Sequence, residues 1–139
     1  MNRTKNAALW LTLLLLASPA SAEDPPPFMQ ELYPPELIMR HGRDIGLSEA
    51  QRKAITQAVA ETQATTLELQ WDMQDAAQTL AELVSQDRVN EEAALEAAAR
   101  VMEIEGRVKR AHLGLLIRIK NQLTPDQQQR LGQLRAKGR

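Results

Sequence analysis

Apolar residues recur every three or four positions along two long stretches of the chain, with polar residues between them. The first stretch runs from Ser48 to Val84 without a glycine or proline, and the second runs from Asn90 to about Gln122. Spacing that alternates between three and four residues is typical of the buried face of a long, coiled-coil-like helix. The pattern therefore predicts two long helices joined by a short polar segment at 85–90.

The apolar faces of these two stretches match when the chain folds back on itself at the polar segment. An antiparallel arrangement places Ile55 beside Ile119 and Leu69 beside Ile104. Because apolar residues meet along most of the length, we expect an antiparallel helical hairpin.

Shorter helices are expected at both ends of this hairpin. A short helix is predicted from about Pro35 to Asp44, since proline is tolerated in a first helical turn and Gly46 ends the element. The last helix is predicted to follow Thr124 as its N-cap, with Pro125 at the first helical position. The sequence thus predicts an all-α fold, a long helical hairpin with short N- and C-terminal helices.

The N-terminus has the features of a secretory signal peptide. Arg3 and Lys5 precede an apolar run at 7–17, and the small residues 20–22 follow, which predicts cleavage after Ala22. The run is too short to span a membrane, so we expect an exported protein without stable membrane insertion. In a Gram-negative cell, such a protein is located in the periplasm. The predicted regions are a signal peptide at 1–22, a flexible, proline-rich segment at 23–34 and a single helical domain at 35–139.

Composition narrows the classes of function. The chain of 139 residues has no cysteine, two histidines and 3% aromatic residues. The missing cysteine excludes a disulfide scaffold, a thiol enzyme and an iron–sulfur protein. No catalytic constellation and no glycine-rich phosphate loop stands out, so we expect a protein that is not an enzyme.

Charge is segregated along the chain. Residues 23–106 hold 17 acidic and six basic residues, whereas residues 107–139 hold nine basic residues and one acidic residue. Such a basic segment can bind acidic proteins, anionic lipids or nucleic acid, and export argues against nucleic acid. Arg107, Lys109 and Arg110 lie at the start of this segment, where they could contact an acidic protein surface. A basic helix end that only complements the helix dipole is the alternative.

One short motif occurs twice, and each copy opens a helix. In the pattern Leu-[Ser/Thr]-x-x-Gln, the hydroxyl accepts a hydrogen bond from the glutamine's backbone amide while the glutamine side chain reaches back, which forms a capping box. The motif residues are Leu47, Ser48 and Gln51 in the first copy and Leu123, Thr124 and Gln127 in the second.

Two such motifs around a long hairpin, in a small exported chain without cysteine, resemble the Spy/CpxP family of periplasmic stress proteins. The second copy, LTPDQ, matches the LTxxQ motif of that family fully, and the first, LSEAQ, has serine in place of threonine. The resemblance implies a thin, curved cradle formed by a homodimer. It also implies an ATP-independent chaperone that binds unfolded or misfolded clients and suppresses their aggregation in envelope stress. The family includes metal-responsive relatives similar to CnrX and ZraP, so a heavy-metal sensor or resistance protein is one alternative. A second alternative is a regulator of an envelope-stress sensor kinase, whose acidic periplasmic domain would bind the basic segment at Arg107, Lys109 and Arg110.

Apolar residues outside the predicted seam are candidates for a client surface. Leu113, Leu116 and Ile117 form one patch beside basic residues, and Leu67 and Trp71 form another. Apolar area beside positive charge suits the loose capture of unfolded chains, although packing in the core or in a dimer explains such a patch equally well. The predicted client-binding residues are Leu37, Ile38, Met39, Arg107, Arg110, Leu113, Leu116, Ile117, Arg118 and Lys120.

The candidates for a metal site are sparse. His41 and Asp44 share one helix face, but a transition-metal site needs three or four converging ligands. His112 lies among basic residues that repel a cation. We therefore expect no metal and no cofactor, with a divalent metal at His41 and Asp44 as the weaker alternative.

Overall fold

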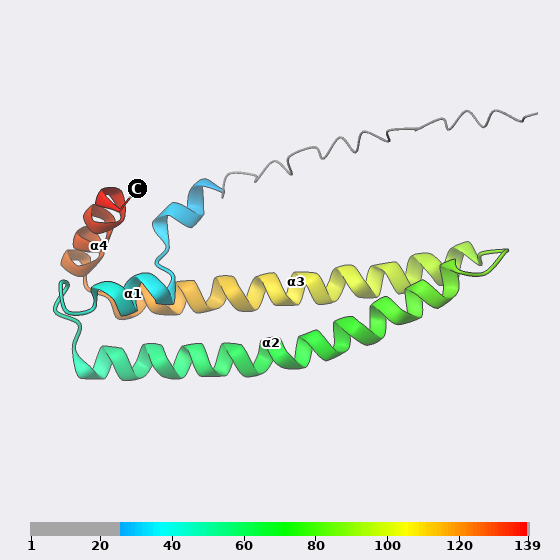
Figure 1. The fold of residues 1–139 in the computed structure, drawn as a ribbon, viewed down its shortest axis with the longest axis horizontal. Coiled ribbons are helices and arrows are strands. Elements are labelled where there is room, and N and C mark those ends of the chain that lie inside the picture. The colour runs from blue at the N-terminus through cyan, green and yellow to red at the C-terminus, as the bar shows by residue number, and fades with distance from the viewer. Residues whose placement is uncertain (1–25, 139) are drawn as a thin grey trace, which may run out of the picture.

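A computed structural model describes residues 26–138 and shows a long, curved helical hairpin with short helices gathered at its open end (Figure 1). No strand occurs within this range, and the predicted all-α fold is confirmed. The predicted signal peptide at 1–22 and the first residues of the segment 23–34 lie outside the described residues. In chain order, the elements are the 3-10 helix η1 (Pro27–Glu31) and the α-helices α1 (Pro35–His41), α2 (Glu49–Val84), α3 (Glu91–Gln122) and α4 (Pro125–Lys137).

The two long helices form the hairpin that the apolar pattern predicts. α2 has 36 residues and α3 has 32, and the two pack against each other. At a rise of about 1.5 Å per residue, each extends roughly 50 Å. Asn90 caps α3 by accepting a hydrogen bond from the Ala93 N–H at 3.1 Å. Within residues 26–138, no helix combines the length and the apolarity needed to cross a membrane.

The core is divided into two clusters along the hairpin. The larger cluster lies at the open end, where Ile55 and Ile119 meet side chains from the short helices, such as Ile38 and Leu131. The smaller cluster lies nearer the tip and consists of Leu69, Ala76 and Ile104, with partly buried residues packed against it. The open end therefore holds most of the buried apolar area, while the arm of the hairpin has only a narrow seam.

α1 ends earlier than the sequence predicts. The helix stops at His41 instead of Asp44, and residues 42–46 form turns. The Leu47 N–H donates to the Gly42 carbonyl at 2.8 Å, which turns the chain toward α2. Gly46 adopts a φ of 65°, a left-handed conformation that costs glycine little. The early end is thus a consequence of the turn that leads into the first motif.

The chain before α1 is docked from η1 onward, although the sequence predicts a flexible segment at 23–34. Arg135 of α4 donates to the Gln30 carbonyl at 2.7 Å and to the Leu32 carbonyl. Its guanidinium also lies 5.1 Å from the centre of the Tyr33 ring, a cation–π distance. The Tyr33 hydroxyl donates to the Gln128 carbonyl at 3.1 Å. Burial raises the pKa of this hydroxyl above its ordinary value, with Arg135 opposing the rise and Glu31 adding to it.

Candidate functional site

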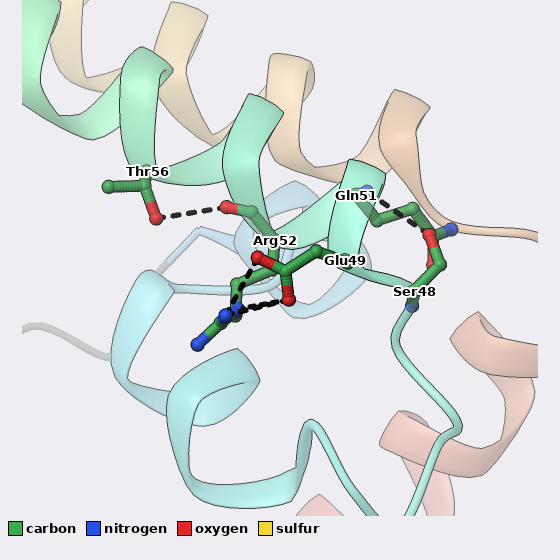
Figure 2. A network of polar contacts seen from close by, with 5 residues as sticks. All are labelled: Ser48, Glu49, Gln51, Arg52 and Thr56. Carbon is green, nitrogen blue, oxygen red and sulfur yellow. Dashed lines mark hydrogen bonds and ion pairs between the residues drawn. The ribbon is translucent and has the colours of Figure 1, made fainter.

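Both copies of the repeated motif form capping boxes in the structure. The Ser48 N–H donates to Oε1 of Gln51 at 3.0 Å, and the Gln51 N–H donates to Oγ of Ser48 at 3.1 Å (Figure 2). The same pair of bonds joins Thr124 and Gln127, at 2.9 Å and 3.3 Å. Each motif thereby satisfies backbone amides that the first turn of its helix would otherwise leave without partners.

The two capping glutamines also bind each other across 76 residues of sequence. Nε2 of Gln51 donates to Oε1 of Gln127 at 2.8 Å, and Nε2 of Gln127 donates to Oε1 of Gln51 at 3.0 Å. The second proton of each amide group points to a backbone carbonyl just ahead of the opposite motif. Gln51 donates to the Gln122 carbonyl at 2.6 Å, and Gln127 donates to the Gly46 carbonyl at 3.3 Å. We call this reciprocal pair the amide interlock.

The amide interlock uses the full hydrogen-bonding capacity of both side chains. A primary amide offers two donors and an oxygen with two lone pairs. In each glutamine the oxygen accepts from its own N-cap and from the other glutamine, while the nitrogen donates to the other glutamine and to a carbonyl. The interlock therefore fixes the start of α4 against the start of α2. The sequence predicts both caps but not the contact between the two glutamines. The signal for that contact was the matching order of residues in the two motifs.

An exposed ion pair lies one residue beyond the first cap. Arg52 donates to Glu49 at 2.6 Å, and Oγ1 of Thr56 donates to the Arg52 carbonyl at 2.9 Å (Figure 2). The hydrogen bond to Glu49 raises the pKa of Arg52 above its ordinary value. Because the pair is exposed to solvent, its contribution to stability is small.

Two apolar grooves border α1. The α1–α2 groove has a volume of about 720 Å³ and is lined by Ile38, Leu47 and Ile55, with Arg43 and Arg52 among the polar residues of its wall. The α2–α3 groove, of about 540 Å³, runs from the start of α1 over both long helices. Its apolar lining includes Pro34, Pro35, Met39, Val59, Leu67 and Leu115.

Met39 lines both grooves, and its side chain is 75% exposed. Leu67 borders the α2–α3 groove, and Trp71 follows one helical turn later on α2 with 63% of its surface exposed. These residues form an accessible apolar surface that extends from Met39 at the open end to Leu67 and Trp71 in the middle of α2. A flexible thioether and a large indole suit contacts with varied apolar partners.

Two of the predicted client-binding residues lie in the core. Ile38 and Leu116 are each only 2% exposed, so neither presents a surface to a client in this structure. Lys120, one turn after Leu116, donates to the Glu31 carbonyl at 2.9 Å. This contact places the docked N-terminal segment against that part of α3, where the sequence suggested a free surface. The same hydrogen bond engages the ammonium group of Lys120, which the sequence predicts to bind clients.

The other apolar candidates remain at the surface to different degrees. Met39 and Ile117 are exposed, whereas Leu37 and Leu113 are half-buried. Met39 is the one that borders the grooves, while Ile117 and Leu113 lie on α3 and line neither of them. The structure therefore separates the α3 patch from the groove surface instead of joining all candidates into one site.

Two of the four basic candidates pair with acidic residues of α2. Arg107 lies 3.6 Å from Asp72, and Arg118 lies 3.0 Å from Glu61. Arg110 is exposed and forms no ion pair with any residue of 26–138. The positive charge of α3 is thus partly neutralised by α2, a pairing that the opposite charges of the two helices favour.

The weak metal candidates contact each other. Nδ1 of His41 lies 2.9 Å from Oδ2 of Asp44. In the described part of the chain, no group of three or more histidine and carboxylate side chains converges on one point. One imidazole and one carboxylate fall short of the three or four ligands of an ordinary transition-metal site.

Comparison with known proteins gives a match over nearly the whole chain. Residues 6–130 match the model of a protein family described as heavy-metal resistance. No curated protein and no solved structure matches the chain. The matched range contains the hairpin, both motifs and the amide interlock.

Proposed function

Because the chain belongs to the heavy-metal resistance family, we propose that it is a periplasmic, ATP-independent, chaperone-like protein that binds unfolded or misfolded clients and suppresses their aggregation in envelope stress. The family consists of non-enzymatic helical proteins and includes the Spy/CpxP-like periplasmic proteins. Membership therefore confirms the resemblance that the two motifs indicate. Chaperone activity and metal resistance are both compatible with this family, so the choice between them depends on the surface of the molecule.

The observation that carries the proposal is the exposed apolar surface around Met39. This side chain stands between two open grooves, and Leu67 and Trp71 continue the surface along α2. Unfolded clients differ from folded partners in exposing scattered apolar side chains. Shallow apolar grooves can accept such side chains one at a time without requiring a fixed shape.

Light scattering of an aggregating client tests this proposal. We expect the purified protein to suppress the scattering, and the triple variant Met39→Ser, Leu67→Ser, Trp71→Ser to need about tenfold more protein for the same effect, since 1.4 kcal/mol of lost affinity gives that factor. Val84→Ser and Val89→Ser serve as the matched control, because these exposed residues flank the hairpin tip away from the grooves. No suppression at stoichiometric excess, or equal losses in both variants, would contradict the proposal.

We also propose that the working form is a homodimer. Leu95, Met102 and Ile117 are exposed on α3, and their spacing places them on a stripe away from the seam with α2. A second copy is the partner that a symmetric oligomer would place there. Sedimentation at tens of micromolar should give a dimer, and Met102→Glu should shift it to a monomer. A wild-type monomer at that concentration would refute this part of the proposal.

Heavy-metal binding is the second candidate, favoured by the contact between His41 and Asp44. It requires further ligands, which a partner subunit or the metal's own water molecules would supply. If this function holds, titration calorimetry with Zn²⁺, Ni²⁺ or Cu²⁺ gives micromolar or tighter binding that His41→Ala abolishes. A flat titration would eliminate this candidate.

A further inference from the structure

A third depression, between α1 and α4, differs from the apolar grooves in its charge. This basic cleft has a volume of about 460 Å³, within the usual range of roughly 300–1,000 Å³ for ligand sites. Arg40 and His41 line it from α1, Arg135 and Lys137 line it from α4, and Leu37 and Leu134 supply its apolar surface. No acidic side chain is among its lining residues.

The positive charge of the basic cleft is largely uncompensated. Arg40, Arg135 and Lys137 form no ion pair with any residue of 26–138. Of the lining side chains, only His41 has an ion-pair partner among residues 26–138, which is Asp44 at 2.9 Å. The ends of α1 and α4 carry partial negative charge, but a helix end amounts to about half an elementary charge. Three full charges therefore exceed what the helix ends can neutralise.

Arg135 is also held in place before any ligand arrives. Its guanidinium donates to two backbone carbonyls of the N-terminal segment and stacks over Tyr33. Carbonyls orient a guanidinium without removing its charge. A cation that is already fixed loses less conformational entropy on binding, and a guanidinium suits a carboxylate better than an ammonium does.

We propose that the basic cleft binds the free C-terminus of a client chain whose last residue is apolar. The terminal carboxylate would lie among Arg40, Arg135 and Lys137, and the last side chain would lie against Leu37 and Leu134. A carboxylate next to an apolar side chain matches a cleft that both cations and leucines line. The choice of a peptide as the ligand rests on the proposed function. The inference adds that the protein would prefer client segments that end in an apolar residue with a free carboxylate.

Fluorescence anisotropy with two labelled peptides tests this inference. Both peptides are hexapeptides of identical sequence ending in leucine, one with a free carboxylate and one with a C-terminal amide. We expect the protein to bind the carboxylate peptide at least about tenfold more tightly, in line with 1.4 kcal/mol for one well-placed charge-assisted contact. Equal affinity for the two peptides would overturn the inference.

Charge variants separate a specific site from general attraction. Arg40→Gln and Lys137→Gln should each weaken binding of the carboxylate peptide severalfold, whereas Arg130→Gln should not, because Arg130 is exposed on α4 outside the cleft. An equal loss of binding in Arg130→Gln would attribute the binding to net charge and overturn the inference. The inference would also be overturned if octanoate displaced the labelled peptide and bound more tightly than the peptide does. Peptide binding that survives in a protein unable to suppress aggregation would refute the proposed function but leave the cleft intact.

Discussion

The Leu131→Ala variant is expected to lose about 2–5 kcal/mol of the free energy of unfolding, the range for truncating a fully buried leucine. Leu131 is 0% exposed and belongs to the larger core cluster, together with Tyr33, Ile38 and Ile119. The side chain therefore joins α4 to the N-terminal segment, α1 and α3. Its truncation leaves a cavity where the N-terminal segment, α1 and α4 meet.

The divided core makes this prediction specific to one end of the molecule. In Leu131→Ala, hydrogen exchange should accelerate in α1 and α4, while the arm around Leu69 and Ile104 keeps its protection, because that arm has its own cluster. Thermal unfolding should begin at a lower temperature than in the wild type. Leu134→Ala is the matched control. Because this residue of α4 is only half-buried, its truncation should lower the free energy of unfolding much less. Uniformly faster exchange along both long helices would contradict the two-cluster description.

The sequence predicts the hairpin well because one physical cause dominates there. Apolar residues at three- and four-residue spacing leave a long helix only one face to bury, and the two faces match in a single antiparallel register. Ile104, for example, is expected in the seam and is fully buried. The caps are equally local, since Ser48 and Thr124 need only a glutamine three residues later to form their hydrogen bonds.

The candidate surface was harder to predict because it depends on contacts between distant segments. Ile38 and Leu116 have the same apolar character as residues of a surface patch, but both are buried in the structure. The N-terminal segment docks near Leu116, where Lys120 donates to the Glu31 carbonyl. Arg135 contributes to that docking by donating to two backbone carbonyls. Backbone carbonyls are present at every position, so no sequence pattern marks the acceptors. The two grooves and the basic cleft arise from the same packing of short helices.

The largest polar effect is expected at the amide interlock. Replacing Gln127 by alanine removes the acceptor of the Thr124 N–H and the donor to the Gly46 carbonyl, and it leaves the amide of Gln51 half satisfied. Gln127 is only 8% exposed, so water replaces these partners poorly. At 1–3 kcal/mol for a buried polar group left without a partner, we expect a loss of about 2–3 kcal/mol in the free energy of unfolding.

A double-mutant cycle in denaturant isolates the contact between the two glutamines. Gln51→Ala should lower the free energy of unfolding by about 1–2 kcal/mol, which is less than the loss in Gln127→Ala, because Gln51 is only half-buried. The double variant should lose less than the sum of the two single losses by about 1 kcal/mol, a coupling typical of side chains in direct contact. Gln78→Ala provides the baseline, since Gln78 bonds only the exposed Glu82 on its own helix.

A glutamate in place of Gln127 distinguishes the interlock from the cap. Glutamate keeps an oxygen that can accept from the Thr124 N–H, so the capping box survives. At neutral pH it has no proton to donate to the Gly46 carbonyl or to Oε1 of Gln51, which accept from Gln127 at 3.3 Å and 3.0 Å. If the interlock dominates, Gln127→Glu is nearly as unstable as Gln127→Ala. Wild-type stability in Gln127→Glu would instead assign the whole effect to the cap, and the motif would then act on each helix separately.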